Sequence, residues 1–189
     1  IVFSGPLVKM TGATFKTFEG TGAASLAANL VTTAYSYAFN LRNVSAQEAV
    51  DGWVDVAVTK DPKDYKDKLF GSLSLNYQGT GRGLGAEAMI SSAAGSGVYV
   101  ITDAKVKGLA AVKTLNGFFK DKSDEIQFDK INGTLAMKNK VFSYTANNTG
   151  KVGAIRVAGG VNADGVYTPD MKVQCDLKKD FIDSNAVQS

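Results

Sequence analysis

The chain has 189 residues, of which 21 are Lys or Arg, 18 are Asp or Glu and none is His, so its net charge is +3. Hydrophobic residues make up 44% of the chain, and this length fits one domain with a sizeable core. Lys and Asp are interspersed, so the small positive charge does not indicate nucleic-acid binding. The absence of His excludes a Ser-His-Asp triad and a His-ligated zinc, and the single Cys175 excludes an internal disulfide.

The ends and boundaries of the chain carry few signals. It begins at Ile1 without Met or a signal peptide, and it has no apolar run of about 18 residues, so we expect a piece of a longer protein without its membrane anchor. The loop 60–68, where Lys and Asp alternate, is the best candidate for an internal boundary. It is too short to be a convincing linker, so we expect one domain over residues 1–189.

Apolar and polar residues alternate with period two through most of the chain. In the segment 35–42, for example, Tyr, Tyr, Phe and Leu alternate with Ser, Ala, Asn and Arg. This alternation indicates strands with one buried and one solvent-facing side, as in antiparallel sheets, and Asn and Gly between the runs favour hairpins. We predict ten strands, near 2–10, 13–19, 21–30, 33–42, 69–78, 97–106, 131–138, 140–147, 151–161 and 165–177.

Three segments have helical spacing instead. Ser45 and Glu48 match a capping box and are followed by an apolar stripe that extends to Ala57, which predicts a first helix. Further helices are predicted over 84–94 and 108–120. The predicted fold class is therefore mostly β, a curved antiparallel meander sheet with two or three short helices.

The segment Gly79–Gly85 is the strongest candidate for a nucleotide site. It follows a predicted strand, precedes a predicted helix and matches G-x-G-x-x-A. However, the preceding strand is half polar, whereas the first strand of a parallel sheet is apolar on both faces. We interpret the segment as a glycine-rich turn and keep nucleotide binding as an alternative.

Carboxylates gather in 61–67 and 121–129, but both groups are mixed with Lys and lack the spacing of a calcium loop. We interpret them as solvated loops. We therefore predict no catalytic residues, no metal and no cofactor, and a protein that is not an enzyme.

The apolar stripes are the remaining candidate site. They normally form a core, but short helices cover only about half of ten strands, and an uncovered apolar face marks a binding surface. We therefore predict a groove for acyl chains, with the Tyr hydroxyls toward its rim. Its predicted lining is Tyr35, Tyr37, Phe39, Leu73, Leu75, Tyr77, Phe142 and Tyr144.

The order of these segments resembles the C-terminal region of AsmA-like proteins. The resemblance covers about residues 68–177 and rests on the Gly-rich strand 73–81, the small-residue helix 86–95, the strand 101–108, the segment 128–140 and the hairpin 153–161. Residues 1–58 are similar to the section upstream of it. Ala104 and Lys140 stand where the family usually has Gly.

The resemblance implies a non-enzymatic protein of the Gram-negative periplasm, anchored in the inner membrane as a full-length chain. It implies a role in outer-membrane assembly and the conveyance of phospholipid along a β-lined groove. The implied partners are phospholipid or another acyl lipid, and other envelope proteins. The alternative is a purely structural β-rich scaffold with a closed core and no small ligand.

Overall fold

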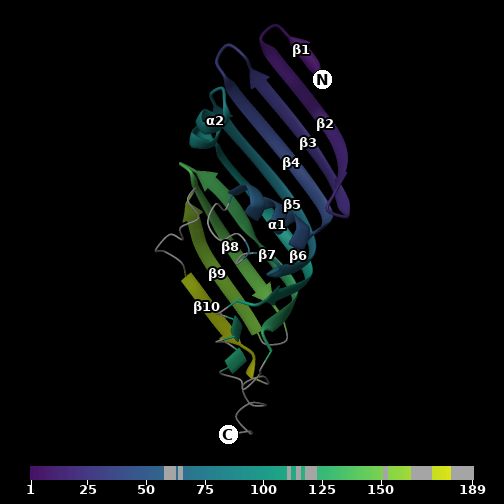
Figure 1. Cartoon of the computed structure of the whole chain (residues 1–189), viewed down its shortest axis with the longest axis vertical. Helices are drawn as coiled ribbons and strands as arrows, with labels where there is room; N and C mark the ends of the chain where they lie inside the picture. The colour runs from purple at the N-terminus through teal and green to yellow at the C-terminus, as the bar shows by residue number, and fades with distance from the viewer. Residues whose placement is uncertain are drawn as a thin grey trace.

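The computed structural model is an open ten-stranded antiparallel sheet in which every strand pairs with its neighbours in the sequence (Figure 1). The structure describes residues 1–57, 63, 66–109, 112–113, 116–117, 123–150, 153–162 and 172–179. The strands are β1 (Val2–Ser4), β2 (Leu7–Thr17), β3 (Gly20–Asn29), β4 (Ala34–Ser45), β5 (Leu69–Arg82), β6 (Ala94–Lys107), β7 (Glu125–Lys138), β8 (Val141–Thr149), β9 (Gly153–Asn162) and β10 (Lys172–Leu177).

The predicted fold class is confirmed, but the first two predicted strands are divided differently. The sequence placed a break near Thr11 and Gly12, whereas the chain turns at Gly5 and β2 continues past Gly12 as a bulge between Met10 and Ala13. Both glycines have positive φ, 57° at Gly5 and 63° at Gly12. Because a tight turn and a bulge use the same backbone conformation, a glycine alone does not distinguish them.

Two helices are described, α1 (Ala46–Ala57) and α2 (Ala86–Ser92), where the first two were predicted. The hydroxyl of Ser45 accepts a hydrogen bond from the Glu48 amide at 3.3 Å, as a capping box requires. The amide of Ser45 donates to the carbonyl of Phe18 instead of to Glu48. Within the third predicted helix, residues 112, 113, 116 and 117 are helical, and much of the remainder lies outside the described residues.

The hydrophobic core lies beneath α1, at one end of the sheet. Val44, Leu73, Ile101 and Ile131 are direct neighbours across β4, β5, β6 and β7, so they form one continuous buried row. Val112 is buried against the same cluster. Each such side chain contributes about 1.5–3 kcal/mol when it is removed from water. The core therefore fixes this half of the sheet, and α1 does not cover the other half.

Candidate functional site: an open aromatic face

All eight residues predicted to line a groove lie on the face of the sheet that carries α1. The strand register places them in cross-strand rows, with Phe39 opposite Tyr77 and Leu41 opposite Leu75. We define the open face as the three rows that lie beyond the core. These rows are Phe3–Val8–Ala28–Tyr35–Gly81, Met10–Leu26–Tyr37–Gly79–Gly95–Met137–Phe142 and Ala13–Ala24–Phe39–Tyr77–Gly97–Leu135–Tyr144.

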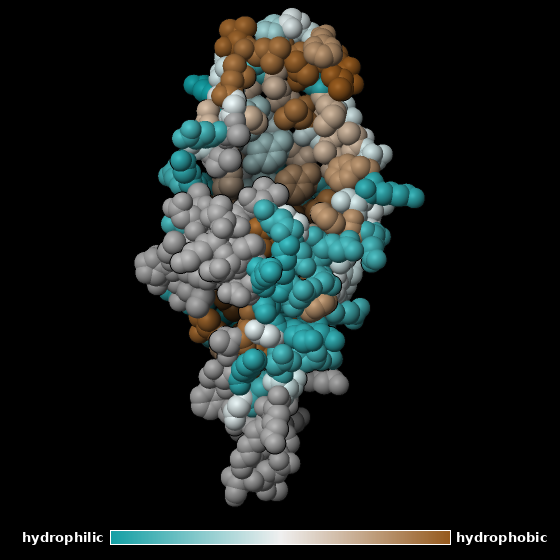
Figure 2. Space-filling view, viewed as in Figure 1, coloured by the Kyte–Doolittle hydropathy of each residue, from teal (hydrophilic) through white to brown (hydrophobic). Residues whose placement is uncertain are grey.

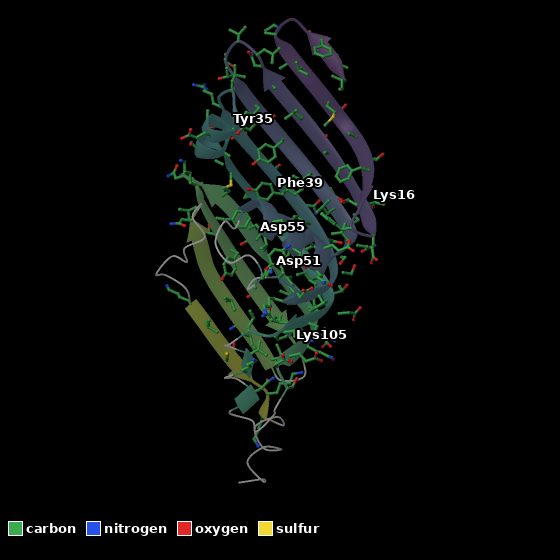
Figure 3. All side chains as sticks on the ribbon, viewed as in Figure 1. Lys16, Tyr35, Phe39, Asp51, Asp55 and Lys105 are labelled. Atoms are coloured by element: carbon green, nitrogen blue, oxygen red, sulfur yellow. The ribbon has the colours of Figure 1, made fainter. Side chains whose placement is uncertain are left out.

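Four aromatic rings form a ladder on the open face. The ring centroids are 6.1 Å apart for Tyr35 and Tyr37, 6.1 Å for Tyr37 and Tyr77, and 5.2 Å for Phe39 and Tyr77, with interplanar angles of 28°, 20° and 21°. Offset stacking at such distances stabilises the arrangement beyond the area buried. Tyr35 and Phe39 lie over the upper part of the sheet, away from Asp51 and Asp55 of α1 (Figure 3).

Glycines on the neighbouring strands make room for these rings. A Cβ atom at Gly79 would stand 2.5 Å from Cζ of Tyr37, and one at Gly95 would stand 2.7 Å from the hydroxyl of Tyr77. Gly81 faces the ring of Tyr35 in the same way. The glycine-rich segment is thus a strand that accommodates tyrosines. Because β5 and β6 are antiparallel neighbours, the parallel β-α-β unit behind the nucleotide-binding alternative is not formed there.

The predicted groove residues divide into a closed and an open group. Leu73 is only 8% exposed and belongs to the core beneath α1, so its prediction as a groove residue is wrong. Leu75 packs against the same core cluster. Tyr35, Tyr37 and Phe39 are half-buried, as are Phe142 and Tyr144, and Tyr77 is buried within the ladder. Leu73 and Leu75, which lie in adjacent rows of the same face, therefore belong to the core and its border.

The open face is apolar throughout its described rows. None of the three rows contains a charged residue, since alternation places Lys9, Lys16, Arg42 and Arg82 on the opposite side. Leu26, beside Tyr37, is 39% exposed. Figure 2 shows apolar and aromatic surface over the upper part of this face, and mainly hydrophilic surface lower down, over α1.

We predicted that the tyrosine hydroxyls would face water or headgroups at the rim, whereas the hydroxyls of Tyr35, Tyr37 and Tyr77 have partners within the protein. Tyr35 donates to the carbonyl of Met89 in α2 at 2.9 Å, and the hydroxyls of Tyr37 and Tyr77 bond to each other. Tyr99, next to the core, donates to the carbonyl of Thr145 at 3.0 Å. Burial raises the pKa of Tyr77 to about 12 and also raises the pKa of Tyr37 and Tyr144. The open face is thus uncharged at neutral pH.

The sequence pattern did not indicate the opposite face of the sheet as a candidate binding surface. Two open hollows of about 790 Å³ and 760 Å³ are lined mainly by residues of that face, and their other lining residues, among them Tyr37, Phe39 and Tyr77, belong to the rows of the open face. Apart from Val98, the alternate positions of β3–β7 that line them are small or polar, and small residues permit the sheet to curve toward that side. The only signal was the recurrence of Ser, Ala, Thr, Asn and Gln at these positions, in particular at Ser25, Ser36, Ala38, Asn40, Asn76, Gln78, Thr80, Ser96, Thr134 and Ala136.

The charged groups form ordinary surface contacts. Lys66 pairs with Asp55, and Lys105 lies 3.6 Å from Glu125, while Asp61, Asp64 and Asp121 of the predicted carboxylate loops lie outside the described residues. Within the described ranges, no three His, Cys, Asp or Glu residues come together in a way that could hold a metal ion. None of the described helices is long and apolar enough to cross a membrane.

Comparison of the chain with known proteins identifies no relative. No family model matches the chain, and no curated protein and no solved structure matches it.

Proposed function

We propose that the protein binds acyl chains of lipids on the open face and carries out no chemistry on them. The observation that supports this most is the aromatic ladder Tyr35–Tyr37–Tyr77–Phe39, which lies in an uncharged part of the sheet that α1 does not cover. Tyr77 is buried within it, and the other three rings are half-buried. An acyl chain needs no directional partner, so an apolar surface without buried charge suits it. Each methylene removed from water contributes about 0.8 kcal/mol.

The dimensions of the ladder fit an extended chain. The segment 35–39 of β4, which carries three of the four rings, extends for about 13 Å at about 3.3 Å per residue, and side chains at every second position point to the open face. Half of a long acyl chain laid along it contributes several kcal/mol before the costs of binding are subtracted. A role in the periplasm, an inner-membrane anchor and a part in outer-membrane assembly rest on the resemblance to AsmA-like proteins alone.

A structural scaffold is the second candidate function, and one observation favours it. The hydroxyls of Tyr35, Tyr37 and Tyr77 already have partners within the protein, as is usual for tyrosines in a packed interior. A scaffold needs no ligand on the ladder. The two functions differ in whether the open face takes up a lipid at all.

A fluorescence titration with dansyl-labelled undecanoic acid separates them. We expect the wild-type chain to bind the probe and Leu26→Glu to lose binding at least tenfold, because a carboxylate is then placed beside Tyr37. Val98→Glu is the matched control, since Val98 is 55% exposed and alternation places it on the opposite face. It should bind the probe as the wild type does.

Two outcomes contradict acyl-chain binding on the open face. One is a folded wild-type chain that does not bind the probe, which leaves the scaffold. The other is binding that Leu26→Glu leaves intact and Val98→Glu abolishes, which places the ligand in the hollows of the opposite face. Circular dichroism of each variant shows that a loss of binding is not a loss of fold.

A further inference from the structure

Large apolar side chains are exposed in and beside the connections between strands at one end of the sheet. These connections lie at the top of Figure 1, and Figure 2 shows hydrophobic surface at the same end. In the turn between β3 and β4, Leu30 is 58% and Val31 is 78% exposed. Leu84, before α2, is 73% exposed, and Met89 of α2 and Phe3 of β1 are exposed as well. We call this set the apical end. It is distinct from the ladder, because its residues are in turns and at a strand edge.

These connections are held together by hydrogen bonds. The amide of Leu30 donates to the carbonyl of Pro6 at 2.8 Å, and the amide of Gly83 donates to the carbonyl of Thr33 at 3.0 Å. Within the turn, the side-chain oxygen of Asn29 accepts from the amides of Val31 and Thr32, both at 3.0 Å. The turn therefore has an ordered backbone that holds Leu30 and Val31 in solvent, although nothing in its own geometry requires apolar residues there.

The charges near the apical end are mostly positive. Lys9 and Lys138 line the same hollow, and Arg82 pairs with Ala34 at the end of β5. Lys140 lies in the turn between β7 and β8. All four cations are exposed, and none forms an ion pair with a described residue. Among the described residues near this end, Glu87 of α2 is the acidic one.

We propose that the apical end docks on an anionic lipid bilayer, with Leu30, Val31 and Leu84 entering the interface and the cations facing the headgroups. Exposed aliphatic side chains flanked by Lys and Arg have the chemistry that interfacial membrane binding uses. A neutral protein surface would match the aliphatic side chains but not the cations. The proposal does not depend on acyl-chain binding by the ladder, since different residues carry it.

Co-sedimentation with vesicles tests the proposal on the full chain. The vesicles consist of phosphatidylcholine and phosphatidylglycerol in equal parts, with pure phosphatidylcholine for comparison. We expect binding to the anionic vesicles, a loss of at least tenfold in Val31→Glu, and no change in Val98→Glu. Lys138→Ala should weaken binding about fivefold, as should Lys9→Ala, and added salt should weaken it further.

A dye attached at position 31 reports insertion directly. Val31→Cys and Val98→Cys are made in a Cys175→Ser background, because Cys175 is exposed and would also be labelled. An environment-sensitive dye at position 31 should shift to the blue with anionic vesicles, and one at position 98 should not.

Three results would overturn the proposal: no binding of the folded chain to anionic vesicles, binding that Val31→Glu does not weaken, or equal shifts at both dye positions. Self-association of the wild type that Val31→Glu abolishes, without vesicle binding, would assign the apical end to a second copy of this chain instead. Titration of the Leu26→Glu variant with vesicles keeps the two proposals apart, because docking should survive in that variant.

Discussion

Aromatic rings and glycines are matched across neighbouring strands of the open face. The ring of Tyr37 lies against Gly79, that of Tyr35 against Gly81, and that of Tyr77 against Gly95 and Gly97. A glycine weakens a strand by itself, but the ring beside it covers the exposed backbone and restores packing. The stability of each pair therefore depends on the missing Cβ atom.

Gly95→Ala tests this dependence. The new Cβ would stand 2.7 Å from the carbonyl oxygen of Gln78 as well as from Tyr77, so the strand or the ring must shift. We expect a loss of about 1–3 kcal/mol in the free energy of unfolding, measured by urea titration. Gly117→Ala is the control, because no heavy atom lies within 4 Å of its added Cβ. It should be neutral or stabilising by up to about 1 kcal/mol, and equal losses in both variants would contradict the account.

The buried tyrosines also predict how stability depends on pH. Burial raises the pKa of Tyr77 and of Tyr99 from 10.0 to about 12 in the folded chain. Between these values the unfolded chain releases the phenolic protons and the folded chain keeps them, so stability is complete below pH 10 and falls as pH rises toward about 12. We expect the urea midpoint to fall over this range.

Tyr77→Phe removes one of these groups and should make the fall shallower without abolishing it, because Tyr99 remains. Urea titrations at several pH values above 10 measure the two slopes. Parallel slopes in wild type and variant would show that Tyr77 ionises equally easily in the folded and unfolded chain.

At the scale of elements, α1 divides one face of the sheet into a closed and an open half. The cause is local: the bulge between Leu41 and Val44 in β4 and the capped turn at Ser45 direct the chain onto the face just above Leu73 and Ile101. The connection at the other end of β5 leads into α2, which is shorter. The ladder therefore lies beyond α1, and α2 reaches it at Tyr35, whose hydroxyl donates to the Met89 carbonyl.

A matched pair of leucines tests the division. Leu73→Ala removes a side chain that is 8% exposed and should cost about 2–5 kcal/mol in the free energy of unfolding. Leu26→Ala removes one that is 39% exposed and should cost less than about 1 kcal/mol. Comparable losses in urea titrations would mean that both halves are closed.

Strand alternation was sufficient to predict the sheet, its meander order and the side on which the ladder lies. It was not sufficient to separate Leu73 from Tyr37, because both occupy apolar positions of the same face and only the placement of α1 distinguishes them. The positions of Gly5 and Gly12 show a second limit, since positive φ serves a turn at one and a bulge at the other. The hydroxyl of Tyr35 donates to the carbonyl of Met89, which lies 54 residues further along the chain, and no local sequence pattern indicates such a partner.

At the scale of the whole molecule, the sheet is open and has unequal surfaces. Its first edge is covered by only three residues of β1, so β2 beyond Lys9 has no further strand beside it among the described residues. One face carries α1 and the ladder, the other carries most of the residues that line the two hollows, and the apical end carries aliphatic turns. A ligand bound to the ladder would thus extend toward the surface that we propose to meet the bilayer.

The most direct test of acyl-chain binding is photo-crosslinking with a diazirine-labelled fatty acid, followed by residue-resolved mass spectrometry of the full chain. Acyl-chain binding on the open face predicts adducts on Leu26, Tyr37, Phe39 and Tyr144. It also predicts that these adducts are lost in Leu26→Glu but not in Val98→Glu. Adducts confined to Ser25, Ser36, Gln78 and Ser96 of the opposite face, or a folded protein with no adduct at all, would contradict it.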